Sequence, residues 1–108
     1  MLDFVVRLGS EQLGITLDTG HAFQHGINIS KFVERYKSHI INVHIHDSDG
    51  KVAHLPVGEG KIDFTAIVKS LKEVGYSNAL SLELLDISSE KLIQSKNKIE
   101  MIERSFRD

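Results

Sequence analysis

Residues 17–21 read Leu-Asp-Thr-Gly-His, and this stretch does most to decide the fold. It places an acid directly after an apolar run, followed by a glycine and an imidazole. Later segments repeat this arrangement of an acid or imidazole at the end of a β-type run: Val-His-Ile-His-Asp at 43–47, His-Leu-Pro-Val-Gly-Glu-Gly at 54–60 and Leu-Glu-Leu at 82–84. Oxygen and imidazole ligands that converge from successive strand ends can hold a divalent metal. The pattern therefore predicts a metal site at the ends of the strands.

Outward from this stretch, the apolar spacing predicts strands that alternate with helices. The chain is expected to begin with the end of a helix over Leu2–Leu8, which Gly9 terminates. A loop is expected over Asp47–Ile62. The remaining predicted elements are strands over Leu13–Leu17, Ile40–His46 and Ala79–Leu84, and helices over Asn28–Ser38, over Phe64–Val74 and from Ser88 or Ser89 to Phe106. Because strands separated by such helices form right-handed crossovers, we predict an α/β fold of three βα units with parallel strands.

The strand predicted over residues 40–46 has one apolar face and one polar face. Alternation assigns Ile41, Val43 and Ile45 to the first face, and Asn42, His44 and His46 to the second. Burying a polar face in a closed core costs free energy unless its side chains bind a partner there. Because parallel strands end at one edge of a sheet, where ligands bind, that edge is predicted to gather Asp18, His44 and Glu83.

Composition narrows the class of protein. The 108 residues are 41% hydrophobic and 26% charged, which is typical of one soluble domain over residues 1–108. A net charge of -2 gives no bulk attraction to nucleic acid or to anionic lipid. The absence of cysteine excludes disulfides and thiolate metal sites and is compatible with the cytoplasm, which we expect as the location. No apolar run approaches the roughly 20 residues that span a bilayer, and residues 1–10 lack the pattern of a signal peptide.

Together these segments resemble the xylose isomerase-like superfamily of TIM barrels, which includes sugar and sugar-phosphate isomerases and epimerases and the apurinic-site endonucleases of DNA repair. The resemblance covers nearly the whole chain and adds Ile-Asp-Phe at 62–64 and Leu-Ser-Leu-Glu at 80–83 to the segments above. It implies that residues 1–108 form the C-terminal portion of a (β/α)8 barrel, namely its sixth to eighth βα units. Complete barrels have about 250 residues. We therefore expect the chain to complete its sheet by self-association, as a homo-oligomer, or with a second polypeptide that supplies the missing strands.

The resemblance also implies roles for individual residues. Asp18, His44 and Glu83 match metal ligands, and carboxylates with imidazole suit Mn, Mg, Co or Zn. Glu83 also matches a catalytic acid/base, while His21 and His54 match positions that contact substrate or a further metal. The implied reaction is a metal-dependent isomerisation or epimerisation of a sugar or sugar phosphate through an enediolate. Barrels of this family bind the metal with a further Glu from the fifth strand, which has no equivalent here, so whether this chain alone is an enzyme stays open.

Two alternatives stay open beside this interpretation. An apurinic-site endonuclease would use an Asp two residues before the loop histidine, where this chain has Val52, and would need basic groups for DNA. The second alternative is a truncated barrel without catalytic activity. At single positions, His46 is expected to be a hydrogen-bonded core histidine and Asp47 to fix the loop through backbone hydrogen bonds. The run 58–60 is expected to shape a tight turn, with a phosphate cradle as the alternative.

Overall fold

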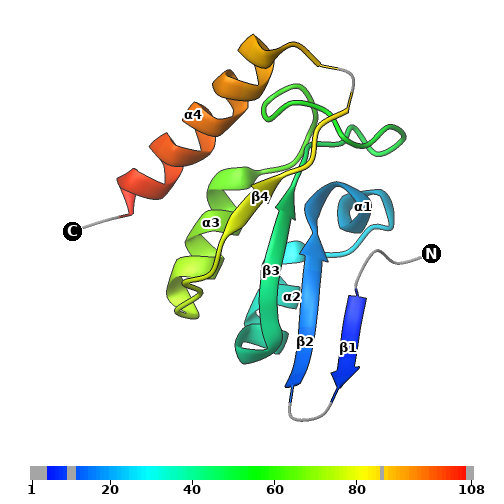
Figure 1. Cartoon of the computed structure of the whole chain (residues 1–108), viewed down its shortest axis with the longest axis vertical. Coiled ribbons are helices and arrows are strands. Elements are labelled where there is room, and N and C mark those ends of the chain that lie inside the picture. The colour runs from blue at the N-terminus through cyan, green and yellow to red at the C-terminus, as the bar shows by residue number, and fades with distance from the viewer. Residues whose placement is uncertain (1–4, 10–11, 86, 107–108) are drawn as a thin grey trace.

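The computed structural model describes residues 5–9, 12–85 and 87–106. It contains one sheet in the order β1-β2-β3-β4, shown in Figure 1. The strands are β1 (Val5–Gly9), β2 (Gln12–Asp18), β3 (Ile40–Ile45) and β4 (Leu80–Leu82). Strands β2, β3 and β4 are parallel to one another, whereas β1 is antiparallel to β2. The predicted α/β fold with three parallel strands is therefore confirmed.

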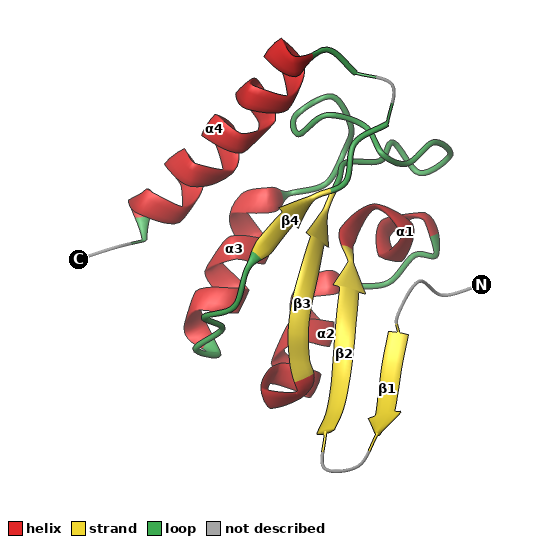
Figure 2. Cartoon of the chain, viewed as in Figure 1, coloured by secondary structure: helices red, strands yellow, loops and turns green. Residues whose placement is uncertain are grey.

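Helices follow each parallel strand. They are α1 (Thr19–Gln24), α2 (Ile29–Tyr36) with a 3₁₀ turn over Lys37–His39, α3 (Phe64–Glu73) and α4 (Ser89–Ser105). Side-chain caps start the longer helices at the expected places, because Asn28, Asp63 and Ser88 each accept a backbone N–H three residues on. In Figure 2, α2 and α3 lie together behind the sheet, and α4 lies beyond β4. None of the described helices has the length and apolar character needed to cross a bilayer.

The beginning of the chain differs from the prediction. The expected end of a helix over Leu2–Leu8 is wrong, because Val5–Gly9 form a strand instead; residues 2–4 lie outside the described residues. The ladder pairs Val5 with Thr16 and Gly9 with Gln12. Pairing with β2 therefore decides this segment, and apolar spacing within it could not reveal that partner. The short helix α1 was not predicted either.

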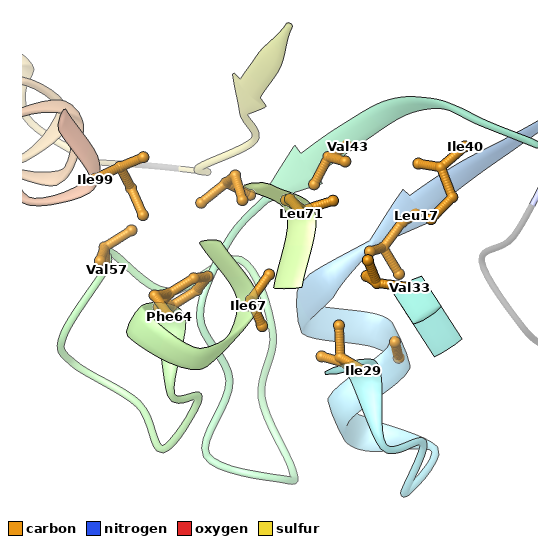
Figure 3. Close-up of a cluster of buried hydrophobic side chains, with 12 residues drawn as sticks. Leu17, Ile29, Val33, Ile40, Val43, Val57, Phe64, Ile67, Leu71 and Ile99 are labelled. Atoms are coloured by element: carbon orange, nitrogen blue, oxygen red, sulfur yellow. The ribbon is translucent and has the colours of Figure 1, made fainter. Parts of the chain in front are cut away.

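The hydrophobic core lies between the sheet and the helices (Figure 3). Leu17 of β2, Val33 of α2 and Val43 of β3 are completely buried there. The rest of the buried cluster comes from every layer: Ala22, Ile29, Ile40, Ile45, Val57, Phe64, Ile67, Leu71 and Ile99. One apolar face of β2 and β3 thus packs on α2 and α3, which leaves the opposite face for polar side chains.

An irregularity in the β2–β3 ladder explains why one predicted position differs. Ile15 pairs with Ile40, but the next residue of β2, Thr16, pairs with Asn42, so β3 carries one extra residue. This residue, Ile41, is 43% exposed instead of sharing the buried face of Val43. It lies against Gly14, where a Cβ would come within 2.3 Å of the Ile41 side chain. The predicted alternation therefore holds only from Asn42 onward.

We expect Leu17→Ala to lower the free energy of unfolding by about 3 kcal/mol, because it removes a fully buried side chain and leaves a cavity. Urea unfolding followed by circular dichroism measures the effect. Leu92→Ala is the matched control, because Leu92 is 42% exposed on α4. Equal midpoints for the two variants would contradict the described core.

Candidate metal centre

Asp18 ends β2 and begins α1. Its Oδ1 accepts the backbone N–H of His21 at 3.1 Å, which makes Asp18 the N-cap of the helix. The ring Nδ1 of His21 lies 3.1 Å from the same oxygen, and the ring of His46 contacts it as well. Among the residues that the structure describes, all these contacts fall on Oδ1. The acid is thus anchored through one oxygen, which leaves Oδ2 for another partner.

Thr19 and Gly20, the next two residues of the Leu-Asp-Thr-Gly-His motif, lie against His46, which directly follows β3. The hydroxyl of Thr19, completely buried, donates to the carbonyl of His46 at 2.8 Å and accepts the backbone N–H of His46 at 3.1 Å. At Gly20 a Cβ would lie 2.1 Å from Nδ1 of His46. Only glycine therefore allows the imidazole to approach α1 this closely.

His46 is completely buried, and both of its ring nitrogens have partners. Nε2 is bonded to Oδ1 of Asp18, and Nδ1 accepts the backbone N–H of His54 at 2.8 Å. The prediction of a hydrogen-bonded core histidine is confirmed. Its pairing with Asp18 could not be predicted from the sequence, because the two residues come from different strands.

His44 and Glu83 form a second pair. Nδ1 of His44 lies 2.8 Å from Oε1 of Glu83, and the two side chains are 27% and 39% exposed. Glu83 follows β4 directly, and its N–H continues the ladder to the carbonyl of Ile45 at 2.9 Å. Nε2 of His44 lies 3.1 Å from Nδ2 of Asn42. Both side chains of the pair are therefore accessible from the solvent.

The register relates the first pair to the second. Asp18 is the ladder partner of His44, and His44 is the partner of Ser81. Side chains of residues that face each other across a ladder point to the same side of the sheet. Asp18 and His44 thus share the polar face, at the carboxyl ends of the parallel strands.

Among the described residues, the structure forms two groups whose possible ligand atoms all lie within 4.8 Å of one another. One contains Asp18, His46 and Glu83, and the other contains His21, His46 and His54. The predicted ligands Asp18 and Glu83 are thus brought together, as are the predicted substrate-contacting histidines. His44 contacts Glu83 but belongs to neither group; the histidine common to both is His46.

His54 is held in an unusual backbone conformation. Its φ of 61° lies in the left-handed region, which non-glycine residues rarely adopt, so the backbone is strained at this site. Its Nδ1 lies 3.0 Å from the carbonyl oxygen of Glu83, and because a carbonyl accepts, this nitrogen donates. The ring stacks on His46 at 4.1 Å and meets His21 edge-on at 4.9 Å. These contacts leave Nε2 of His54 as the acceptor of the ring.

Asp47 organises the glycine-containing loop from inside. This buried carboxylate accepts the backbone N–H groups of Ser48 and Ile62 on Oδ1, and those of Gly58 and Gly60 on Oδ2, at 2.8–3.1 Å. The prediction that Asp47 fixes the loop is confirmed. The alternative of a phosphate cradle is not supported, because the amides of Gly58 and Gly60 already donate to the carboxylate of Asp47.

The charge of Asp18 suits a cation ligand. Burial raises its pKa, but the hydrogen bonds from the His46 ring and from the His21 amide outweigh burial and hold the pKa below its ordinary value of 3.8. The carboxylate is therefore ionised at neutral pH. With Glu83 and imidazoles beside it and no thiolate in the chain, the donors fit a hard or borderline divalent cation.

Comparison with known proteins gives the relatives of this chain. The model of the family described as "Xylose isomerase-like TIM barrel" matches residues 1–104. An uncharacterized protein of Methanocaldococcus jannaschii is 42% identical over 87 residues, which are 77% of this chain and 29% of the relative. An inosose isomerase of Halalkalibacterium halodurans is 30% identical over 118 residues, or 96% of this chain and 42% of the relative.

Solved structures agree with this relationship. A D-tagatose 3-epimerase-like protein superposes with a TM-score of 0.76 at 37% identity, over 88% of this chain and 36% of that one. The IOLI protein, solved with a zinc atom, superposes with a TM-score of 0.67 at 27% identity, over 88% of this chain and 39% of that one. The chain therefore spans less than half the length of these relatives. From its sequence and its fold, the chain belongs to the xylose isomerase-like TIM barrel family.

Proposed function

We propose that this chain carries the metal-binding edge of a sugar or sugar-phosphate isomerase or epimerase. The observation that carries the proposal is the position of Asp18, His44 and Glu83 at the ends of three neighbouring parallel strands. Asp18 and His44 are ladder partners, and Glu83 contacts His44 at 2.8 Å. The names of the relatives, an inosose isomerase and a D-tagatose 3-epimerase-like protein, support a sugar-like substrate.

In the proposed site, Asp18, His44 and Glu83 hold a divalent cation, with zinc favoured by the zinc-bound structural relative and Mn, Mg and Co as the other candidates. The cation would supply positive charge to neighbouring oxygens of the substrate. Glu83 would take and return a proton at the adjacent substrate carbon. His54, whose Nδ1 is bonded to the Glu83 carbonyl, would direct Nε2 towards a substrate hydroxyl together with His21.

Completion of the barrel is a further part of the proposal. The sheet of described strands ends at β1 and β4, and unpaired strand edges favour association with another chain. The resemblance also implies a fifth-strand Glu that would come from elsewhere. We propose that a second copy or a chain supplying the missing strands covers the site. Light scattering at micromolar concentration tests this, because a compact, well-folded monomer would contradict it. The predicted cytoplasmic location stays a prediction.

An endonuclease function receives no specific support. Val52, where that branch would need an acidic ligand, is 53% exposed and carries no ligand atom. The net charge of -2 gives no general attraction to a DNA backbone. The non-catalytic alternative is separated from the proposal by experiment.

The test begins with calorimetric titration of the metal-free protein with Mn²⁺ and Zn²⁺. We expect the parent chain to bind, and Asp18→Ala and Glu83→Ala to bind at least about 100-fold more weakly, since loss of a ligand exceeds the usual effect of its supporting groups. Glu73→Ala, which removes an exposed carboxylate of α3, is the control. Unchanged affinity in both site variants would refute the proposed ligands.

The second stage assays aldoses, ketoses and their phosphates with each metal and after chelation, beside incision of abasic DNA. We expect metal-dependent interconversion of at least one sugar and no incision. A metal-binding chain that is silent in both assays would favour the non-catalytic alternative, and incision without sugar turnover would replace the proposal with the endonuclease.

A further inference from the structure

We propose that His46 is a positioning residue that orients Asp18 and His54 together and does not itself bind the cation. This inference rests on the proposed function, because Asp18 and His54 are residues of the proposed site. Neither the family resemblance nor the sequence pattern gave His46 such a role. It follows from the hydrogen bonds around one completely buried ring.

The partner of Nδ1 fixes the tautomer of His46. A backbone N–H can only donate, so Nδ1, which lies 2.8 Å from the amide of His54, must carry the lone pair. The ring hydrogen is then on Nε2, where it is donated to Oδ1 of Asp18. Neither nitrogen keeps a lone pair for a metal. His46 therefore belongs to both groups of possible ligands only as a side chain that holds the other members close together, and it does not bind the cation itself.

The surroundings hold the ring in one orientation. His54 stacks on one face at 4.1 Å with an interplanar angle of 6°, and His21 meets the ring edge-on at 4.9 Å. Gly20 leaves room for Nδ1, and the hydroxyl of Thr19 holds the backbone of His46 on both its N–H and its carbonyl. A completely buried ring that is held by these contacts cannot rotate to offer a nitrogen elsewhere.

The imidazole of His46 thus holds two residues of the proposed site, Asp18 and His54. Through Nε2 it holds Oδ1 of Asp18, which leaves Oδ2 to bind the cation. Through Nδ1 it holds the strained backbone of His54, whose φ is 61° and whose ring is a proposed substrate contact. Removing the imidazole should therefore weaken both metal binding and substrate binding, although His46 contacts neither the cation nor the substrate.

Two conservative variants separate the two roles. In His46→Gln the side-chain amide reaches about as far as Nε2 and can still donate to Asp18, whereas in His46→Asn the amide oxygen lies near the position of Nδ1 and can still accept from His54. His46→Leu removes both hydrogen bonds. His39→Asn is the control, since His39 is exposed on the 3₁₀ turn.

We expect His46→Leu and His46→Asn to weaken Mn²⁺ binding about 10–100-fold in calorimetry, the usual effect of losing a group that orients a ligand. His46→Gln should stay within about threefold of the parent in metal affinity but raise KM for the sugar identified in the assay. Nitrogen-15 NMR of the metal-free parent should show His46 with its hydrogen on Nε2. Circular dichroism and urea unfolding establish that each variant is folded.

The outcomes distinguish this inference from the proposed function. Parent-like Mn²⁺ affinity in folded His46→Leu overturns the positioning role while the metal site stands. A hydrogen on Nδ1 in the metal-free parent also overturns it. If the parent binds no metal, the proposed function fails, and the NMR tautomer with the shift of the Asp18 carboxyl signal between parent and His46→Asn still decides whether His46 orients Asp18.

Discussion

Asp47→Ala is expected to lower the free energy of unfolding by about 4 kcal/mol, because the substitution removes a buried carboxylate and leaves its backbone donors without an acceptor. The carboxylate accepts N–H groups from both ends of the loop, at Ser48 and at Gly58, Gly60 and Ile62. The loop packs closely on this carboxylate, since a Cβ at position 60 would lie 2.4 Å from Oδ1. Urea unfolding measures the loss, and proteolysis should cut first within residues 48–62.

Asp49→Ala is the matched control for this prediction. Asp49 lies in the same loop and also accepts backbone N–H groups, from Lys51 and Val52 at 2.9 Å, but it is exposed. Water replaces it as the acceptor, so its loss should leave the unfolding midpoint close to that of the parent. Asp47→Asn should fall between the two, because one amide oxygen keeps two of the donors while its NH₂ group faces the other two. Similar midpoints for Asp47→Ala and Asp49→Ala would show that the loop does not depend on the buried charge.

Glu83→Gln is expected to reduce kcat by about 1,000-fold on whichever sugar the assay identifies, because an amide cannot transfer the proton that general acid–base catalysis requires. The amide keeps an oxygen beside His44 and nearly the same volume, so the fold should survive. In D₂O the parent should introduce deuterium at the reacting carbon of the sugar, and the variant should not. Mass spectrometry of the product reads this directly.

Glu59→Gln provides the comparison for Glu83→Gln. Glu59 is an exposed acid that is paired only with Lys91 at 2.6 Å among the described contacts, and it belongs to neither group of possible ligands. Its substitution should leave both kcat and deuterium incorporation at the level of the parent. Turnover by Glu83→Gln within a few-fold of the parent would move the acid/base role to another group.

Much of the fold follows from the sequence, because local rules decide it. The apolar spacing of α2, α3 and α4 and their caps Asn28, Asp63 and Ser88 gave helices within one or two residues of those observed. The alternation in β3 from Asn42 onward was also visible. Segment Val5–Gly9 was misjudged because its hydrogen bonds come from β2, and α1 was missed because a helix of six residues has too few turns for an apolar period.

The candidate site, like the fold, could be predicted from the sequence only in part. That Asp18, His44 and Glu83 end successive strands was predictable, because parallel strands end at one edge. Which of the two histidines on the polar face meets Asp18 was not, because His44 and His46 are equivalent in an alternating pattern. The choice depends on Gly20 and on the amide of His54, which supply the space and the donor for the second ring.

The close approach at Gly20 also constrains how this family can diverge. A Cβ there would lie 2.2 Å from Cε1 of the His46 ring, so a larger residue at position 20 requires a smaller one at position 46. A relative with a side chain at position 20 should therefore lack the imidazole at position 46, which couples two positions that are distant in the sequence.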